Sequence, residues 1–381
     1  MALLLILLGL HAYVGWRLWP ALAFSPAWQT GLLALLLVSW LLMPMALWAR
    51  RIRHQPLSDR MSWVGTLLMG LFSSLLVLTV LRDLLLLLLG AVAAASAAMG
   101  TATGIWTGWQ QPTAVAVLLL AGLFTLWGLV NARRTATVVR VDVPIERLPA
   151  ALHGFTIAQI SDIHVGPTIK RGYVQAIVDR VNALNADVVA LTGDLVDGPV
   201  HALAPHVAPL ATLASRHGTF FVTGNHEYYS GADAWVVELR RLGLSVLINE
   251  HVLLQHDGES LALAGVSDFS AHHFNEAERS DPQAAIDGVP VSTFLRVLLA
   301  HQPRSAAAAA QAGFHLQLSG HTHGGQFLPW NFLVRLQQPF TAGLNRLQAM
   351  WVYTSRGTGY WGPPMRLGAP SEITHLRLVA A

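Results

Sequence analysis

The chain has 381 residues, of which 53% are hydrophobic and only 12% are charged, and it contains no cysteine. Soluble globular domains carry about 25% charged residues, so the composition favours a protein with part of its chain in a membrane. The lack of cysteine excludes disulfides and thiolate metal ligands. The first 140 residues hold nine arginines against two aspartates, and the remainder is net acidic. The basic residues flank apolar stretches, so the high isoelectric point does not indicate nucleic-acid binding, and no nucleic-acid partner is expected.

The N-terminal third contains four apolar stretches of about the 20 residues that a membrane span needs. They are residues 2–22, 28–48, 61–81 with an extension to about residue 90, and 113–130. Residues 84–100 are also apolar and could form a fifth span, but we favour an interfacial or re-entrant segment there. The first stretch lacks a basic start, which favours a retained anchor over a signal peptide.

Two arginine clusters orient the predicted spans, because positive charge collects in cytoplasmic loops. The clusters are Arg50, Arg51, Arg53 and Arg60 after the second span, and Arg133, Arg134 and Arg140 after the fourth. With four spans, both clusters lie on one side together with the remainder of the chain. We therefore expect a helical transmembrane domain at residues 1–132 and a cytoplasmic domain at residues 133–381, in a multi-pass protein of a bacterial inner membrane. A fifth span would place the second domain outside.

The second domain alternates apolar strand-like runs with helical stretches, which predicts an α/β fold. The strand-like runs are residues 155–160, 187–192, 219–223, 296–300 and 315–319. The helical stretches are residues 171–184, 203–215, 232–242 and 305–312. Polar residues follow each run: Asp162 and His164, then Asp194, Asn225, His301, and His321 with His323. The carboxyl ends of strands in open α/β sheets meet at one edge, so these side chains are expected to converge.

Carboxylate, amide and imidazole groups in this mixture suit manganese, iron or zinc. Two divalent metals side by side neutralise the charge of a phosphoester and acidify a water. Asp194 is the candidate for the shared ligand, because its two oxygens can each bind one ion. The residues therefore predict a two-metal site that splits phosphate esters.

The short motifs around these residues, in this order along the chain, resemble those of the calcineurin-like metallophosphoesterase superfamily. They are most similar to the motifs of its membrane-bound bacterial subgroup. The motifs are Asp162-Ile163-His164, Gly193-Asp194, Gly224-Asn225-His226-Glu227, His301, and Gly320-His321-Thr322-His323. The resemblance implies a four-layer α/β/β/α sandwich. It implies one metal on Asp162, His164, Asp194 and His323, and a second on Asp194, Asn225, His301 and His321. It also implies that His226, paired with Asp197, protonates the leaving group. Gly198 stands where the protein phosphatases of the superfamily carry an arginine, so a protein phosphatase is not expected.

Several further residues have candidate roles. Arg356 and Arg366 could grip a substrate phosphate through a bidentate fork, and Asn225 could also contact substrate. Glu227 is expected to support its neighbours by hydrogen bonds. Other histidines are assigned ordinary surface or structural roles: His153, His201, His206, His217, His251 and His256. His272 and His273 could face the cleft, but a solvated loop is favoured for them.

The expected function is a metal-dependent phosphohydrolase in which a hydroxide bridging the two metals attacks phosphorus. It would cleave a phosphoester or diphosphate bond. The membrane tether and the apolar residues 327–333 favour a lipid-linked substrate, with the bilayer as a partner. The alternative for this loop is that it packs against the membrane domain or the protein core. The alternative is a membrane sensor or accessory protein that binds metal or a phosphorylated ligand without turnover.

Overall fold

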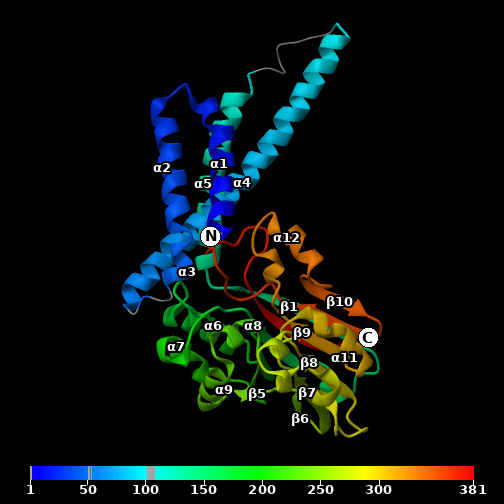
Figure 1. Cartoon of the computed structure of the whole chain (residues 1–381). Coiled ribbons are helices and arrows are strands. Elements are labelled where there is room, and N and C mark those ends of the chain that lie inside the picture. The colour runs from blue at the N-terminus through cyan, green and yellow to red at the C-terminus, as the bar shows by residue number, and fades with distance from the viewer. Residues whose placement is uncertain (1, 50–51, 53, 101–107) are drawn as a thin grey trace. The chain divides into compact units, whose positions relative to one another are not determined.

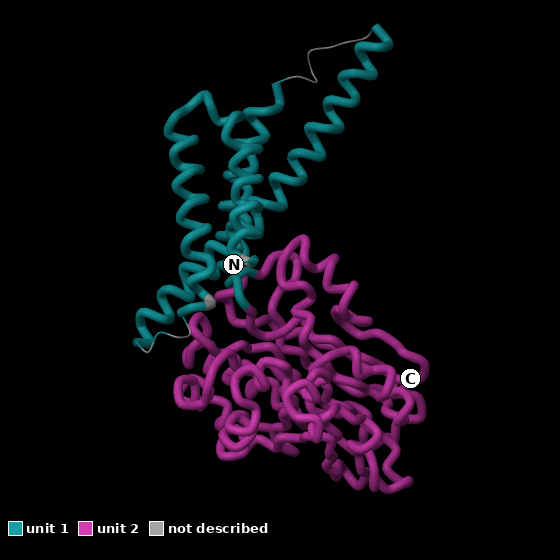
Figure 2. Tube along the Cα trace, viewed as in Figure 1, with its two compact units in different colours: residues 1–130, 362–365 teal, residues 131–361, 366–381 magenta. Residues whose placement is uncertain are grey.

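The computed structural model describes residues 2–49, 52, 54–100 and 108–381 (Figure 1). The chain divides into two compact units, residues 1–130 with 362–365, and residues 131–361 with 366–381 (Figure 2). The first unit is helical, and the second contains all the strands of the described residues.

The first unit is built from apolar helices. They are α1 (Ala2–Leu18), η1 (Pro20–Leu22), α2 (Pro26–Leu42), α3 (Met45–Ala49), α4 (Gln55–Ala98) and α5 (Gln110–Arg133), the last of which runs into the second unit. Three helical segments are long and apolar enough to cross a membrane: Leu4–Leu22, Gln55–Ala98 and Gln110–Arg133. The apolar helix α2 has 17 residues, slightly fewer than a span of about 20 needs.

The structure corrects two expectations about these helices. The stretch 28–48 is divided between α2 and α3. Residues 84–98 do not form a separate interfacial or re-entrant segment, because α4 continues through them for 44 residues without a break. Leucine and alanine dominate this part of α4 and are strong helix formers, so nothing in the local sequence ends the helix. Arg50, Arg51 and Arg53, on which the orientation depends, lie outside the described residues.

Three charged side chains of the first unit, Arg17, Arg82 and Asp83, lie together. The Arg17 Nε and the Tyr13 hydroxyl each donate to Asp83 Oδ2 over 2.7 Å. Arg82 is 4% exposed and donates to Thr113 Oγ1 over 3.1 Å. Such pairing is what charged residues within apolar helices require.

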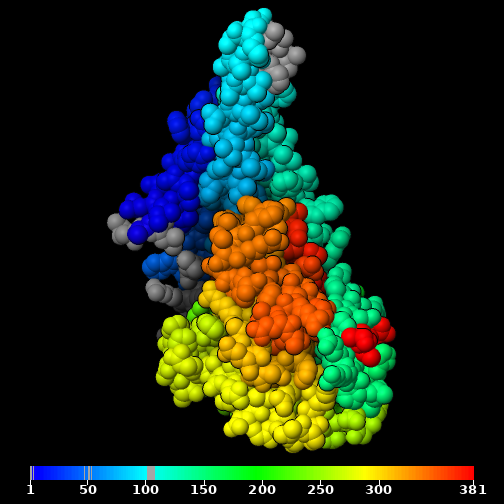
Figure 3. Space-filling model, turned by 90° about the vertical axis from the view of Figure 1, so that its right-hand side faces the viewer, coloured from blue at the N-terminus to red at the C-terminus, as the bar shows by residue number. Residues whose placement is uncertain are grey.

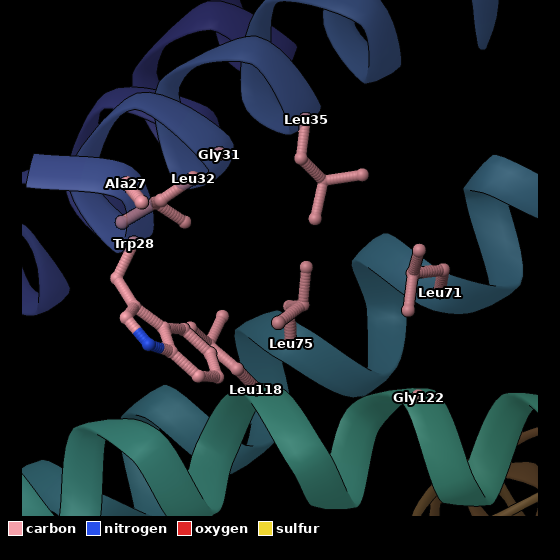
Figure 4. A pocket seen from close by; sticks show the side chains of 9 residues that line it. All are labelled: Ala27, Trp28, Gly31, Leu32, Leu35, Leu71, Leu75, Leu118 and Gly122. Atoms are coloured by element: carbon pink, nitrogen blue, oxygen red, sulfur yellow. The ribbon is translucent and has the colours of Figure 1, made fainter.

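Helices α2, α4 and α5 also line a cavity of about 440 Å³ (Figure 4). Its walls are leucine, tryptophan, alanine and glycine, among them Trp28, Leu75 and Leu118. No charged side chain lines it, so its lining favours hydrocarbon over a polar ligand.

The second unit contains two six-stranded sheets. In spatial order, the first sheet contains β1 (Thr137–Ile145), β12 (Glu372–Ala380), β2 (Thr156–Ile160), β3 (Val188–Thr192), β4 (Thr219–Val222) and β5 (Ser245–Val246). The second contains β10 (Gly343–Leu347), β11 (Met350–Thr354), β9 (Leu316–Ser319), β8 (Leu295–Leu299), β7 (Glu259–Gly265) and β6 (Glu250–His256).

Helices cover the outer face of each sheet. The first is covered by α6 (Arg171–Asn182), α7 (Val200–Val207) and α9 (Ala232–Arg241), and the second by α10 (Pro282–Ile286) and α11 (Ala306–Gln311). Alternate residues of a strand face opposite sides. In β3, Val188 and Ala190 pack between the two sheets, whereas Val189 and Leu191 pack under the helices. The predicted four-layer α/β/β/α sandwich is therefore confirmed.

Parallel pairing brings the carboxyl ends of the site-forming strands into register. Strands β2, β3 and β4 are parallel neighbours in one sheet, and β8 and β9 are parallel neighbours in the other. The last residues pair accordingly, Ile160 with Leu191 and Thr192 with Val222. The loops after these five strands therefore begin at matched edges of the two sheets.

Candidate metal centre

The predicted ligands form two groups at these strand ends. Asp162, His164 and His323 make one group, and Asp194, His301 and His321 make the other. In the first, His323 Nε2 lies 3.0 Å from His164 Nε2 and 3.5 Å from Asp162 Oδ1. In the second, His301 Nε2 lies 3.1 Å from Asp194 Oδ2 and 3.2 Å from His321 Nδ1.

Asp194 connects the two groups. Its Oδ2 lies 3.1 Å from His301 Nε2 and 3.9 Å from His164 Nε2, which belongs to the other group. The carboxylate is 3% exposed, so its charge needs compensation from its neighbours. This is the position that a ligand shared by two cations would occupy.

Asn225 opens the short helix α8 (Asn225–Ser230) and is 8% exposed. Its Oδ1 is buried and has no hydrogen-bond partner among the described residues. Buried polar atoms are rarely left without a partner, and an amide oxygen accepts a cation as readily as a donor. The donor set and this orphaned oxygen together fit divalent metals.

The backbone at the ligands is strained. Asp162, His164, Asp194, His321 and His323 all have left-handed φ angles, between 50° and 69°. Residues other than glycine seldom adopt this region, and such strain gathers at functional sites. Close packing adds to the constraint, because a Cβ on Gly320 would lie 2.2 Å from Asp162 Oδ2.

Glu227 supports the loops that carry Asp194 and Asn225. Its side chain is fully buried, and its two oxygens accept from the backbone amides of Gly224 (2.6 Å), Leu195 (2.8 Å), Asp194 (3.0 Å) and Val196 (3.3 Å). The carboxylate ties the loop after β3 to the loop after β4, the role expected from the sequence.

Hydrogen bonding and charge prepare His301 and His321 as ligands. His301 Nδ1 donates to the Thr192 carbonyl over 2.7 Å, which leaves Nε2 to face Asp194. Burial would lower the pKa of His301, but the Asp194 carboxylate raises it well above its usual value. Burial, with the nearby His301, lowers the pKa of His321 to about 3 and keeps that ring neutral. A bound cation would replace the proton that the carboxylates now attract to His301.

His226 lies beside the ligand groups with Asp197 behind it. Its Nδ1 lies 2.6 Å from Asp197 Oδ1, and the same oxygen lies 3.1 Å from His164 Nδ1. Burial alone would lower the pKa of His226, but Asp194 and Asp197 raise it to about 9. The ring therefore carries a proton with Nδ1 held by Asp197, and its Nε2 lies 3.9 Å from Asp194 Oδ2.

The two candidate arginines occupy different settings. Arg366 is 1% exposed and donates to the carbonyls of Gly359, Arg356 (2.7 Å) and His323 (3.0 Å). Its Nη2 also lies 3.0 Å from His323 Nδ1. The prediction that Arg366 binds substrate is therefore wrong, because its guanidinium N–H groups are hydrogen-bonded within the protein. Arg366 instead positions His323. Arg356 is bound to Glu372 over 2.8 Å, with a side chain 35% exposed.

The loop of residues 355–359 is hydrogen-bonded to the loop that carries Asp162. This role was not predicted from the sequence. The Thr358 amide donates to the Ser161 carbonyl over 2.7 Å, and the Gly359 amide donates to the Asp162 carbonyl over 3.1 Å. Gly359 has no room for a side chain, because its Cβ would lie 2.1 Å from the Ile163 carbonyl oxygen. The closely spaced glycines of this segment, Gly357 and Gly359, are the sequence feature that could have indicated this close packing.

Comparison with known proteins agrees with this geometry. The family described as calcineurin-like phosphoesterase matches residues 155–325. An uncharacterized metallophosphoesterase of Campylobacter jejuni is 35% identical over 265 residues, which cover 68% of each chain. The chain belongs to the calcineurin-like metallophosphoesterase family.

Two vertebrate relatives of this metallophosphoesterase are named transmembrane protein with metallophosphoesterase domain. The zebrafish (Danio rerio) protein is 39% identical over 70% of this chain and 63% of its own length. The bovine (Bos taurus) protein is 42% identical over 69% of this chain and 62% of its own length. The chain thus matches somewhat less than two thirds of the length of these relatives.

Proposed function

We propose that this metallophosphoesterase is a membrane-anchored phosphohydrolase that uses two divalent metals to cleave a phosphoester or diphosphate bond. The observation that carries the proposal is the position of Asp194 between two ligand groups, with the His226–Asp197 pair beside them. Asp162, His164, Asp194 and His323 would hold one metal, and Asp194, Asn225, His301 and His321 the other. When bound, the metals would neutralise phosphate charge and acidify a water.

The remaining residues of the site act through hydrogen bonds and proton transfer. Asp197 holds Nδ1 of His226, so that Nε2 is the atom that gives its proton to the leaving oxygen. Asp197 also contacts His164 Nδ1, so one carboxylate orients both the acid and a ligand. The rings of Tyr229 and Trp361 pack edge-on against the His226 ring, with centroids 5.2 Å and 5.6 Å away, and the His226 side chain is 13% exposed.

A lipid-linked phosphoester or diphosphate is the proposed substrate. Only three residues separate the end of α5 at Arg133 from the start of β1 at Thr137, no more than about 14 Å of extended chain. The segment 328–336, which follows the last ligand and includes α12 (Trp330–Leu333), lies at the surface of the second unit (orange in Figure 3). Its exposed apolar side chains are Leu328, Trp330, Phe332, Leu333 and Leu336, at 41–83% exposure. Exposed apolar groups of this kind suit an interface with hydrocarbon.

The proposal includes a bacterial inner membrane with the second unit on the cytoplasmic side. The arginines that follow the apolar stretches support this orientation. Accessibility of single introduced cysteines to a membrane-impermeant reagent in intact cells tests it, since the natural chain has none. Labelling of a cysteine at Ser215 only after the cells are permeabilised agrees with the proposal, and labelling in intact cells contradicts it.

The activity is tested on the full chain in detergent with manganese and a chromogenic phosphodiester. His226→Ala should lower kcat by roughly 10²–10⁴-fold, the usual contribution of a general acid, while metal content stays unchanged. His273→Ala, at an exposed histidine that ends the 3-10 helix η5 (Ala271–His273), is the matched control and should be as active as the unmodified protein. Unchanged turnover in His226→Ala would refute the role of this histidine. Bound metal without turnover in the unmodified protein would favour the sensor alternative.

The substrate class is tested by comparing a detergent-dispersed lipid diphosphate with soluble nucleotides. Phe332→Ser with Leu336→Ser should raise KM for the lipid at least several-fold and leave the chromogenic diester unaffected. Equal effects on both substrates would remove the support that segment 328–336 gives to a lipid-linked substrate.

A further inference from the structure

A second group of ligand-type side chains lies at the opposite edge of the two sheets. Asp187 directly precedes β3, whose other end leads to Asp194. His217 precedes β4, and His256 is the last residue of β6 in the second sheet. A strand rises about 3.3 Å per residue, so this group lies roughly 20 Å from the metal centre. The sequence had assigned both histidines ordinary roles.

The ligand atoms of this group have the spacing of a metal site. His217 Nε2 lies 3.0 Å from His256 Nδ1, which lies 3.8 Å from Asp187 Oδ1. The corresponding separations at the metal centre run from 3.0 Å between His164 and His323 to 3.9 Å between His164 and Asp194. Ligands at about 2.0–2.1 Å from a tetrahedral zinc are roughly 3.3 Å apart, within the same range.

Neighbouring groups leave one free ligand atom on Asp187. Its Oδ2 accepts from the amide and the hydroxyl of Thr156, each over 2.9 Å. This fixes the carboxylate and leaves Oδ1 directed at His256. The side chain of Asp187 is 19% exposed, so a cation can reach it from solvent.

His256 is oriented from its far side. Its Nε2 lies 3.4 Å from Asp257 Oδ2, and Asp257 is held by Arg216 over 2.6 Å. A carboxylate behind a histidine that binds through its other nitrogen is the usual support of a metal-bound imidazole. The Phe155 ring packs edge-on against His256 at 4.9 Å and lies 5.9 Å from His217.

We propose that Asp187, His217 and His256 bind a third divalent cation, of the borderline softness of zinc, with water completing the coordination. Two imidazoles with one carboxylate are a ligand set that suits this class of metal. The cation would join the amino ends of β3 and β4 to the β6–β7 hairpin, and so clamp one sheet to the other. At a concentration 100 times its Kd it would raise the folding equilibrium constant about 100-fold.

The test compares zinc equivalents bound by the full chain in detergent after chelation and reloading, measured by inductively coupled plasma mass spectrometry. His217→Gln and His256→Gln should each bind one equivalent fewer than the unmodified protein, with phosphodiesterase activity unchanged. His201→Gln, an exposed histidine of α7, is the matched control and should lose none. The same loss should be seen in an Asp194→Asn background, which separates this site from the catalytic centre. Equal zinc content in His217→Gln and the unmodified protein would overturn the proposal.

A second measurement needs no variant. Modification of His217 by diethyl pyrocarbonate, followed by peptide mass spectrometry, should fall at least several-fold when zinc is added, whereas modification of His201 should stay the same. If the modification of His217 is the same with and without zinc, the proposal is wrong. This measurement is decisive even if the glutamine variants fail to fold.

Discussion

Replacement of Glu227 by glutamine tests whether the support of the ligand loops depends on a carboxylate. One oxygen of Glu227 accepts from the amides of Gly224 and Asp194, and the other accepts from those of Leu195 and Val196. Glutamine has one acceptor oxygen, so whichever way it turns, two buried amides face an NH₂ group. A buried donor without a partner costs about 1–3 kcal/mol, so Glu227→Gln should lower the free energy of unfolding by about 2–6 kcal/mol.

The assay is thermal unfolding of the full chain in detergent, followed by tryptophan fluorescence, together with metal content. For a unit of about 250 residues, 1 kcal/mol shifts Tm by about 2–4 °C, so a fall of roughly 4–24 °C is expected. Glu276→Gln is the control, because its side chain is 70% exposed and should change Tm by less than 2 °C.

The result also decides the protonation state of Glu227. Burial and the neighbouring Asp194 raise the pKa of Glu227 to about 8, while the amides of Gly224 and Leu195 oppose this shift. The hydrogen-bond partners of the carboxylate among the described residues are all backbone amide donors, so we expect it to be ionised in the folded protein. A protonated carboxyl would be close in shape and charge to glutamine. An unchanged Tm with full metal content would therefore refute the reasoning.

Three further results are expected. Asp197→Asn removes the charge 2.6 Å from His226 Nδ1 and should lower kcat by about 10–100-fold in the chromogenic assay; a kcat equal to that of the unmodified protein would contradict the pairing. Gly320→Ala places a Cβ 2.2 Å from Asp162 Oδ2 and should reduce bound metal measured by mass spectrometry, whereas Gly90→Ala, which meets no atom within 4 Å, should not. A chelator should lower Tm and manganese should restore it, since ligands that bind only the folded state stabilise it; a Tm indifferent to both would argue against a metal centre.

The five strands that carry the ligands followed from the sequence, but the remaining strands, β1, β5 to β7 and β10 to β12, and the pairing of the sheets did not. A strand such as β3 has helices on one face and the second sheet on the other, so both of its faces are buried. The residues of such a strand are apolar on both faces, and this pattern can be recognised in a short stretch of sequence. The place of β12 between β1 and β2 joins Thr137 to Glu372, residues far apart in the chain. No local pattern encodes such a contact, and the four-layer architecture came only from a resemblance.

The residues of the centre could be named from the sequence, but their conformations could not. Asp162 and His321 adopt left-handed φ angles that their side chains disfavour, so local preference argues against the observed backbone. Arg366 was assigned to substrate because a guanidinium can bind a phosphate through a bidentate fork, and only the fold shows that it is buried against His323. In the first unit, the length of α4 was missed because Arg82 and Asp83 interrupt the hydropathy without interrupting the helix.

The strained ligand backbones connect the stability of the sandwich to its chemistry. A left-handed non-glycine residue costs on the order of 1–3 kcal/mol, and five ligands share this conformation. The strain persists because contacts from both sheets fix the loops, with Glu227 on one side and the loop of residues 355–359 on the other. Because β2, β3 and β4 belong to one sheet and β8 and β9 to the other, any sliding between the sheets would separate Asp194 from His301. A cation at Asp187, His217 and His256 would oppose that sliding at the far edge, so its removal should lower the Tm while the centre keeps its metals.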